Sequence, residues 1–558
     1  MSSPRPHDAW SALPSPLRSL LVHGSTGREH LLEVSRLALR LAVGDAGAAV
    51  DRARCSGLVL LAQDALLAAW AQSPLDGSLA APLLNAQLLT APLRARPLRG
   101  WPSLPAPVVE LAQAQAHFWQ PPAEGAPWWT ATGLGARLDL AAARHKDEPR
   151  NLFWKHAAWT LAWPLADWAL AESLLDEGGW PRSLAPLRHR FGAQVQFARG
   201  DVHAALASLN AIPAILGDDA GLRASCLLAL GQRQEALEAL RRSVTASPWS
   251  TGDWLRLHDL AADRDRAVAP LPGGVCILLY TYNKARELDE TLTSLAASAT
   301  GDAPVWVLDN GSTDNTASVL DAWCERLGGR LRPLRLPVNI GAPAARNWLL
   351  ALPEVRRHEY LVFLDDDVSL PPDWLARLGA AVAAYPQASV WGCRVVDEAN
   401  PLVAQSVDIS PAPTQPGGQA LLLPGLHGAQ PDLGRFDYLR PCVSVTGCCH
   451  LLREADISTT GGFDIRFSPS QYDDFERDLR LCLAGGHAVY QGHLRVLHKR
   501  RSGSAAERSP AEMGNATANT HKLLTKHGAE DLQRVQARGE ALLEGDLVAK
   551  LRALAGQD

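Results

Sequence analysis

A short apolar run that ends in three consecutive aspartates constrains this chain more than any other feature. Residues 360–364, YLVFL, have the pattern of a buried strand in a parallel sheet. Asp365, Asp366 and Asp367 follow directly, and prolines at 371–372 then prevent further regular pairing. Open α/β sheets bind ligands at the carboxyl ends of their strands, and hard divalent cations prefer oxygen ligands. The run therefore predicts a cation or ligand site, although an acidic turn that caps the next helix has the same pattern.

Length, net charge and cysteine usage exclude several classes of protein. The 558 residues suffice for two or three domains, and 47% hydrophobic residues are typical of globular protein. A net charge of −5 gives no reason to expect a nucleic acid partner. The nine cysteines form no CxxC pair, which favours a reducing compartment over a disulfide framework. The N-terminus lacks a signal-peptide layout and no apolar stretch of about 18 residues occurs, so we expect a cytoplasmic protein without a transmembrane segment.

The first half of the chain predicts an all-α domain over residues 1–270. Its Ala/Leu-rich segments follow helical spacing, and no alternating strand pattern competes with them. Gly200 and Gly231 each begin the same pattern, Gly-x-x-x-x-Ala-Leu-x-x-Leu. This pattern resembles tetratricopeptide repeats over about residues 185–250, although two ordinary helical hairpins explain it equally well.

From residue 274 the pattern changes to strands that alternate with amphipathic helices. Strand-like runs occupy 275–282, 305–310 and 389–396 in addition to the run before the aspartates. This alternation predicts an α/β domain over residues 274–528 with a doubly wound, mainly parallel sheet. Residues 397–441 form a long Pro- and Gly-rich connection, which is typical of a lid or an acceptor loop. Residues 529–558 predict a C-terminal helical tail.

The first two strands of this domain end in polar residues that suit a nucleotide. Asp309 is placed to accept a hydrogen bond from a base N–H, and Gly311 allows the backbone to approach closely. Ser312 also suits a helix N-cap, so simple capping explains part of the pattern. Farther along, small residues around Arg346 suit a backbone that closes over a diphosphate. The donor-side candidates are Thr281, Tyr282, Asn283, Arg286, Asp309, Gly311, Ser312, Gly341, Arg346, Asp365 and Asp366.

Four motifs in register resemble the inverting family 2 glycosyltransferases, which have the GT-A fold. They are VCILLYTYNKARELDETLTSL, VWVLDNGSTDNT, VNIGAPAARN and FLDDDV, within a resemblance that covers about residues 274–504. The resemblance implies a nucleotide-sugar donor, which we expect to be UDP-linked. It also implies Mn²⁺ or Mg²⁺ held by Asp365 and Asp367, and base contacts from Thr281 and Asp309.

Further residues downstream match the same family. Gly462, Phe463 and Asp464 match its Gly-Phe-Asp element, and DDFE (473–476) stands where Glu-Asp-x-Asp/Glu is usual. The resemblance implies that Asp474 is the general base, while Asp473 in place of glutamate keeps that neighbour as an alternative. An acidic first turn that complements the helix dipole is the non-catalytic explanation. Gly447 and Cys448 resemble the segment that flanks the acceptor site, and His498 matches a histidine that joins the metal–diphosphate site.

The sequence thus favours a metal-dependent inverting glycosyltransferase of bacterial type. The acceptor group is expected to be a hydroxyl of a saccharide or a protein. We expect the N-terminal helices to help hold that acceptor molecule. A nucleotidyltransferase has a similar sheet and metal aspartates, but no Gly-rich basic loop follows the first strand here. A helical-repeat interaction protein with an inactive glycosyltransferase-like domain is the other alternative. Chemically competent residues at every proposed position argue against it.

Overall fold

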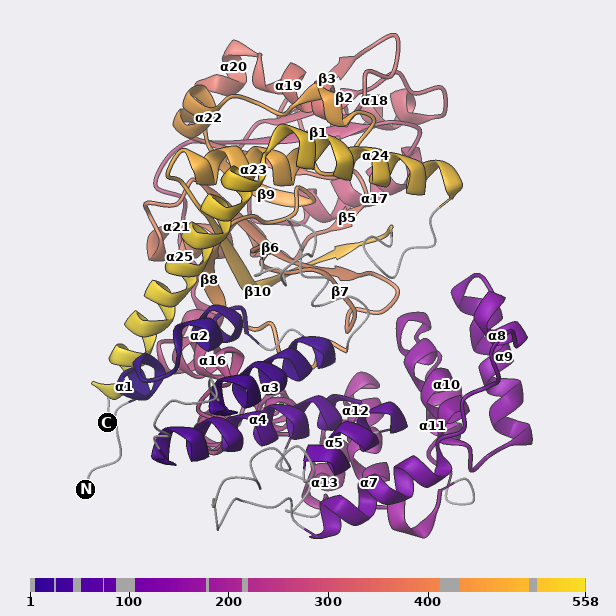
Figure 1. Ribbon diagram of the computed structural model, residues 1–558. Coiled ribbons are helices and arrows are strands. Elements are labelled where there is room, and N and C mark those ends of the chain that lie inside the picture. The colour runs from indigo at the N-terminus through magenta and orange to yellow at the C-terminus, as the bar shows by residue number, and fades with distance from the viewer. Residues whose placement is uncertain are drawn as a thin grey trace. The chain divides into compact units, whose positions relative to one another are not determined.

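The chain separates into two compact units in the computed structural model (Figure 1). The structure describes residues 6–24, 27–43, 52–73, 75–86, 106–176, 180–212, 219–411, 431–500 and 509–556. One unit comprises Met1–Leu257 with Ala429–Arg435, and the other comprises His258–Gly428 with Phe436–Asp558. Residues 412–430 of the expected lid or acceptor loop lie outside the described residues. No helix in the described ranges is long and apolar enough to cross a membrane.

The regular elements that the structure describes in the first unit are all helices, as predicted. Its helices are α1 (Pro6–Ser11), α2 (Ser15–Leu21), α3 (Arg28–Val43), α4 (Arg52–Gln72), α5 (Ala80–Ala86), α7 (Ala106–Phe118), α8 (Pro127–Thr130), α9 (Leu134–Asp147), α10 (Leu152–Leu165), α11 (Trp168–Ser173), α12 (Leu187–Ala198), α13 (Val202–Asn210), α14 (Ala220–Ala229), α15 (Arg233–Ala246) and α16 (Thr251–Ala261), the last of which extends into the second unit. Several tryptophans pack edge-to-face inside it; the rings of Trp128 and Trp154, for example, lie 5.5 Å apart.

The repeated Gly-Ala-Leu pattern falls on two helical hairpins, α12–α13 and α14–α15. Gly200 and Gly231 form the turns with φ of +81° and +74°, a left-handed conformation that glycine adopts without steric strain. Ala205 and Ala236 are fully buried and let the paired helices approach closely. The two segments are therefore equivalent in structure, while their assignment to tetratricopeptide repeats stays a prediction.

The second unit is built on a ten-stranded sheet of order β3-β2-β1-β4-β9-β6-β10-β5, with β7 paired to β6 and β8 to β10. Its strands are β1 (Val275–Thr281), β2 (Val305–Asp309), β3 (Leu331–Arg335), β4 (Tyr360–Leu364), β5 (Val368–Ser369), β6 (Val390–Asp397), β7 (Ala404–Ser406), β8 (Leu439–Cys442), β9 (Cys449–Arg453) and β10 (Ala488–His498). Strands β1 to β4 pair in parallel, as do β6 and β10. The sheet becomes mixed because β9 runs antiparallel between β4 and β6.

Helices accompany this sheet in the alternation that the sequence predicted. They are α17 (Ala285–Ala296), α18 (Thr316–Arg326), α19 (Ala342–Leu350), α20 (Pro353–Arg356), α21 (Trp374–Ala384), α22 (Glu454–Thr460), α23 (Asp473–Leu483), α24 (Pro510–Lys526) and α25 (Ala529–Ala555). The core of the unit gathers inward-facing residues of several strands and helices, among them Ile277, Val307, Val362 and Trp374. Helix α25 packs against β8 and α23 within this unit.

Strand pairing brings distant segments to one edge of the sheet. The ends of β1 and β2 are level, because Thr281 pairs with Asp309. Strand β4 ends beside the start of the antiparallel β9, where Leu364 pairs with Cys449. Strand β10 ends at His498, opposite Val368 of β5. The chain segments that carry the predicted chemistry therefore meet at this edge.

Candidate active site

The three consecutive aspartates after β4 have different surroundings. Asp366 and Asp367 are 6% and 2% exposed, and Lys284 Nζ lies 2.9 and 2.8 Å from their carboxylates. The Asp365 side chain is 24% exposed and lies 3.6 Å from Arg346. Burial raises the pKa of Asp365 to about 6, with a further contribution from Asp367 that Arg346 opposes. Lys284 thus offsets two of the three charges, and Asp365 stays the most accessible of the three carboxylates.

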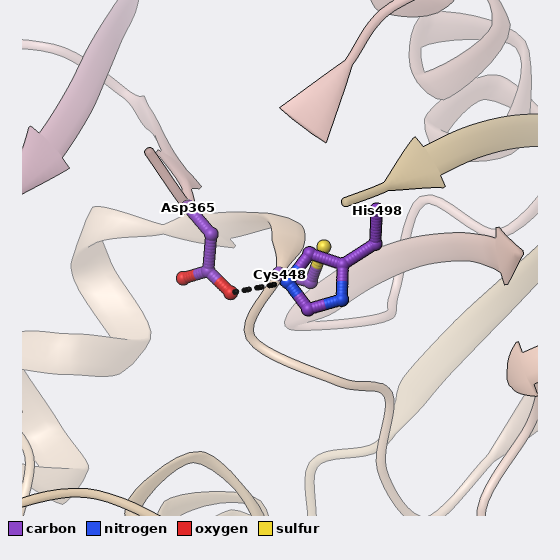
Figure 2. Close-up of side chains that lie close together, drawn as sticks. All are labelled: Asp365, Cys448 and His498. Atoms are coloured by element: carbon purple, nitrogen blue, oxygen red, sulfur yellow. Dashed lines mark ion pairs between the residues drawn. The ribbon is translucent and has the colours of Figure 1, made fainter. Parts of the chain in front are cut away.

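His498 faces two of these carboxylates from the end of β10. Its Nε2 lies 3.1 Å from Asp367 Oδ1. It also lies 4.0 Å from Asp365 Oδ2, the ion pair that is dashed in Figure 2. Its Nδ1 lies 2.8 Å from Gln405 Oε1, which only accepts hydrogen bonds, so Nδ1 carries a proton. Burial opposes the charged imidazole, but the bond to Asp367 outweighs it and raises the pKa of His498. Gln405 therefore directs Nε2 toward the acidic strand end.

The thiol of Cys448 lies in the same cluster. The nearest ligand atoms of Asp365, Cys448 and His498 all lie within 4.8 Å of one another. Figure 2 shows these three side chains around one space, although they come from different strand ends. Carboxylate, imidazole and thiolate are all metal ligands, and Asp367 adds a second carboxylate next to His498. By the chemistry of these donors, the cluster fits a divalent cation.

The two aspartates at the start of α23 differ sharply in environment. Asp473 is 2% exposed and lies 2.6 Å from Arg346, and burial raises its pKa even though that ion pair opposes the shift. Asp474 is half-buried. Its Oδ2 accepts a hydrogen bond from the Gly447 N–H at 2.6 Å, and its Oδ1 accepts one from the Phe475 N–H at 2.8 Å. Asp474 is therefore held by two backbone donors, with no cation paired to it among the described residues.

Arg346 joins the two acidic groups. It is 5% exposed, pairs with Asp473 and approaches Asp365, and it stacks near the rings of Tyr280 and Phe463 at 5.2 and 5.1 Å. The sequence predicted Arg346 at a diphosphate, whereas the structure gives its guanidinium carboxylate partners. Gly447 must stay small here, because an added Cβ would lie 2.9 Å from the Arg346 guanidinium and 3.0 Å from Asp474 Oδ2.

The Gly-Phe-Asp element, residues 462–464, packs next to Arg346 and is held by its own hydrogen bonds and ion pairs. Phe463 exchanges two hydrogen bonds with the side-chain amide of Asn347, at 2.8 and 2.7 Å. A Cβ on Gly462 would lie 2.3 Å from Asn347 Oδ1. Asp464 caps a short turn and pairs with Arg466 and Lys526, each at 2.6 Å. The acceptor role predicted for these three residues stays a prediction.

The predicted donor-side residues form two connected loops. Thr281 is fully buried, and its carbonyl accepts the Asn310 N–H at 2.8 Å. Asp309 Oδ1 accepts the Ser312 N–H at 2.9 Å, and the Ser312 hydroxyl accepts the Asn283 N–H at 2.9 Å. Tyr282 is 44% exposed beside them, so these loops present backbone and an aromatic ring at the sheet edge.

Glycines and a surface ion pair complete the donor-side set. An added Cβ on Gly311 would lie 2.6 Å from the Val338 carbonyl carbon, and its φ of +80° also favours glycine. Gly341 has a φ of +84° and donates its N–H to Asn339 Oδ1 at 2.8 Å. Arg286 pairs with Glu290 at 3.0 Å on an exposed helix surface. The glycines are therefore required for the close approach of two loops.

Comparison with known proteins identifies this part of the chain. The sequence profile of glycosyl transferase family 2 matches residues 276–436. Residues 276–436, less than half of the chain, thus match a glycosyl transferase family 2 domain. The sheet of the second unit and the helices around it have the GT-A type fold that the motifs predicted, and the region before them is helical.

Curated relatives and a solved structure resemble the glycosyltransferase domain. An O-antigen biosynthesis protein of Myxococcus xanthus is 26% identical over 37% of this chain and 15% of its own length. A validoxylamine A glucosyltransferase of Streptomyces hygroscopicus is 30% identical over 39% of this chain and 51% of its own length. The chain thus spans at most about half of these two relatives. A mannosyltransferase structure from Pyrobaculum calidifontis, with GDP-Man and Mn²⁺, is 18% identical over 58% of this chain and 88% of that chain, with a TM-score of 0.32.

The sequence did not predict that Gln405 and Cys448 of the glycosyltransferase domain lie beside the cluster of Asp365 and His498. Gln405 lies in the long 397–441 connection, where no motif marks it, yet it contacts both the ring and the carbonyl of His498. Cys448 was expected near the acceptor, and the structure places its thiol beside Asp365 and His498. Both residues reach the cluster only through the pairing of distant strands, so no pattern of neighbouring residues in the sequence could have predicted their position.

Proposed function

We propose that this protein is a metal-dependent inverting glycosyltransferase that transfers a sugar from a nucleotide-sugar to a hydroxyl group. The observation that carries the proposal is the meeting of three groups at one sheet edge of a family 2 domain. They are the aspartates after β4, the imidazole of His498 and the half-buried carboxylate of Asp474. A metal-assisted displacement needs this combination of a cation site and an accessible base.

The aspartate cluster is the proposed donor end of the site. Asp365, Asp367 and His498 would hold Mn²⁺ or Mg²⁺, which when bound offsets negative charge on the departing diphosphate. Gln405 keeps His498 Nε2 directed at this position through its bond to Nδ1. Lys284 neutralises Asp366 and part of Asp367, so a donor diphosphate meets less repulsion here. The loops with Thr281 and Asp309 are proposed to bind the base, expected to be uracil.

Asp474 is the proposed general base. It takes the proton of the acceptor hydroxyl as the oxygen attacks the anomeric carbon, and the bond to the diphosphate breaks on the opposite face. A single displacement of this kind inverts the anomeric configuration. The N–H groups of Gly447 and Phe475 orient the carboxylate. Asp473 forms an ion pair with Arg346 in the protein interior, which favours Asp474 as the residue that contacts the acceptor.

The acceptor is proposed to be a saccharide or a protein, held in part by the helical unit. We also propose a cytoplasmic location, which suits the unpaired thiols of the eight described cysteines. Neither assignment affects the chemistry at the sheet edge.

A panel of nucleotide-sugars incubated with the full chain and Mn²⁺ or Mg²⁺ tests the proposal. We expect one UDP-sugar to be hydrolysed slowly, with release of UDP, and to be used faster when the correct acceptor is added. Release of pyrophosphate would instead identify a nucleotidyltransferase. Absence of both binding and turnover with every donor would favour an interaction protein with an inactive domain.

A further inference from the structure

The position of Cys448 follows from strand pairing. It immediately precedes β9, and its carbonyl accepts the Asp365 N–H at 2.9 Å, so the two residues are neighbours across the β4–β9 pair. Cys448 and Cys449 both belong to the buried core of the unit, and the Cys393 thiol lies 3.8 Å from the Cys449 carbonyl oxygen. The thiol of Cys448 lies on the side of the aspartates.

The distances suit direct ligation of one cation. Ligand atoms bonded to Zn²⁺ at about 2.0–2.3 Å lie roughly 3.5–4 Å apart in tetrahedral geometry. The ligand atoms of Asp365, Cys448 and His498 already lie within 4.8 Å of one another (Figure 2). They need to move inward by no more than about 1 Å, which side-chain torsions supply without a change of backbone. Cys448 is 4% exposed, so a cation bound there would be shielded from water.

The imidazole is already oriented for this role. Gln405 Oε1 holds His498 Nδ1, and Gln405 Nε2 donates to the His498 carbonyl at 3.3 Å. With the proton on Nδ1, the Nε2 lone pair of the neutral ring is directed at the carboxylates, where a cation would replace the proton. His498 is 8% exposed, so this ring is a buried donor aimed at the cluster.

We propose that Cys448 is an additional ligand of this metal site, and that the site therefore prefers borderline cations such as Zn²⁺ or Co²⁺ over Mg²⁺. The identification of the site rests on the proposed function. On binding, the Cys448 thiol loses its proton to solvent while the sulfur donates an electron pair to the cation, and a protonated His498 also releases its Nε2 proton to solvent. A thiolate favours these cations because Mg²⁺ binds oxygen donors almost exclusively.

Titration of the full-length protein with Co²⁺ tests the thiolate directly. We expect one equivalent to produce a near-ultraviolet sulfur-to-cobalt charge-transfer band. The band should be lost in Cys448→Ser and in Asp365→Ala, and kept in Cys449→Ser, the matched control at the adjacent buried cysteine, which does not belong to the cluster of ligand atoms. We also expect Cys448→Ser to weaken Zn²⁺ binding about tenfold or more. Its affinity for Mg²⁺ should stay nearly unchanged. Far-ultraviolet circular dichroism establishes that each variant is folded.

Two results would overturn this inference. One is stoichiometric Co²⁺ binding that Asp365→Ala abolishes, with no charge-transfer band in the unaltered protein. The other is a band that Cys448→Ser keeps.

Parallel assays of donor hydrolysis separate this inference from the proposed function. If Mn²⁺-dependent hydrolysis occurs without the band, the enzyme assignment stands and the role of Cys448 is wrong. If the band appears but no donor is used, the cysteine ligand is supported and the enzyme assignment fails.

Discussion

At the scale of single residues, the two aspartates at the start of α23 show how packing separates neighbours of the same chemistry. Asp473 is buried against Arg346, while Asp474 is half-buried and held by two backbone N–H groups. We expect Asp474→Asn to lower kcat by a factor on the order of 10² to 10⁴ with donor binding nearly unchanged, because the amide cannot accept the proton. Steady-state kinetics and donor titration measure the two effects.

Asp473→Asn is the matched comparison. It leaves the buried Arg346 charge without its partner, so we expect a loss of stability of roughly 3–5 kcal/mol. If Asp473→Asn removes turnover in a stable protein and Asp474→Asn is tolerated, the base has been assigned to the wrong neighbour.

Asp367 carries the prediction on metal dependence. Its carboxylate bridges Lys284 and His498, and among the described residues it is one of two aspartates that face the imidazole. We expect Asp367→Ala to abolish transfer while the protein stays folded, and excess chelator to have the same effect on the unaltered enzyme. Activity assays with thermal unfolding as the control measure this. Full activity in excess chelator would contradict the metal site.

Gln405 carries a prediction on ligand orientation. Gln405→Leu removes the acceptor that holds His498 Nδ1, so Nε2 is no longer directed at the aspartates. We expect the Kd for Mn²⁺ to rise about 10- to 100-fold. Ser406→Ala changes the next residue of β7, whose hydroxyl donates to the Val407 carbonyl, and should leave this Kd unchanged. Equal effects of both variants would indicate a general disturbance of the strand instead.

At the scale of elements, Glu476 connects α23 to α24. It is fully buried, and its carboxylate lies 3.0 Å from Arg480, 2.6 Å from Lys526 and 3.1 Å from His527. Burial alone would raise its pKa, but these partners outweigh burial and lower the pKa of Glu476 to about 2. Glu476 therefore holds in place the helix that carries Asp474 in its first turn, although Glu476 belongs to the same acidic motif.

This ion-pair cluster predicts a pH-dependent contribution to stability. A carboxylate whose pKa is lower in the folded state stabilises the protein above its unfolded pKa, near 4.5. That stabilisation is lost as pH falls from about 4.5 toward 2. We expect Glu476→Gln to lower the free energy of unfolding by about 3 kcal/mol at pH 7, and by progressively less below pH 4.5. Urea unfolding at several pH values measures the difference.

Glu530→Gln provides the control, because Glu530 is exposed on the first turn of α25. It should change stability by less than about 0.5 kcal/mol at any pH. A difference between the unaltered protein and Glu476→Gln that does not depend on pH would show that the charge of Glu476 is not the source of the effect.

At the scale of the whole molecule, the boundaries of the two units do not follow the order of the chain, and the sequence did not predict this. Ala429–Arg435 belongs with the helical unit, where the Ser225 hydroxyl donates to the Leu433 carbonyl at 2.8 Å. Asp259, from the end of α16, belongs with the sheet unit. It is 1% exposed and lies 3.0 Å from His493 and 2.5 Å from the Leu439 nitrogen. Any truncated protein must respect these assignments.

Removal of the helical unit tests its proposed role in holding the acceptor. A protein that begins at Thr251 keeps Asp259, and we expect it to bind and slowly hydrolyse the donor but to lose most transfer to its natural acceptor. A protein that begins at Leu271 lacks Asp259 and should be less stable, because His493 and the Leu439 N–H lose their buried partner. Undiminished transfer by the Thr251 protein would exclude acceptor docking by the helices.

Local patterns in the sequence were enough for the elements and most of the motif residues. The alternation of strands and helices, the aspartates after β4 and the glycines with positive φ all depend on neighbours a few residues away. For the same reason the helical first unit was predicted correctly within its described residues. The parallel order of β1 to β4 also followed, because short helical crossovers return each strand in the same direction.

Long-range pairing decided what the sequence left open. The insertion of β9 antiparallel to β4 makes the sheet mixed and places Cys448 opposite Asp365, far away in the chain. Burial decided which of two adjacent aspartates pairs with Arg346 and which stays accessible. The position of Gln405 against His498 likewise depends on a pairing across the long connection. The sequence by itself determined which chemical groups the side chains carry. Which of these groups lie close together, and which are removed from water, was decided only when distant strands paired in the tertiary structure.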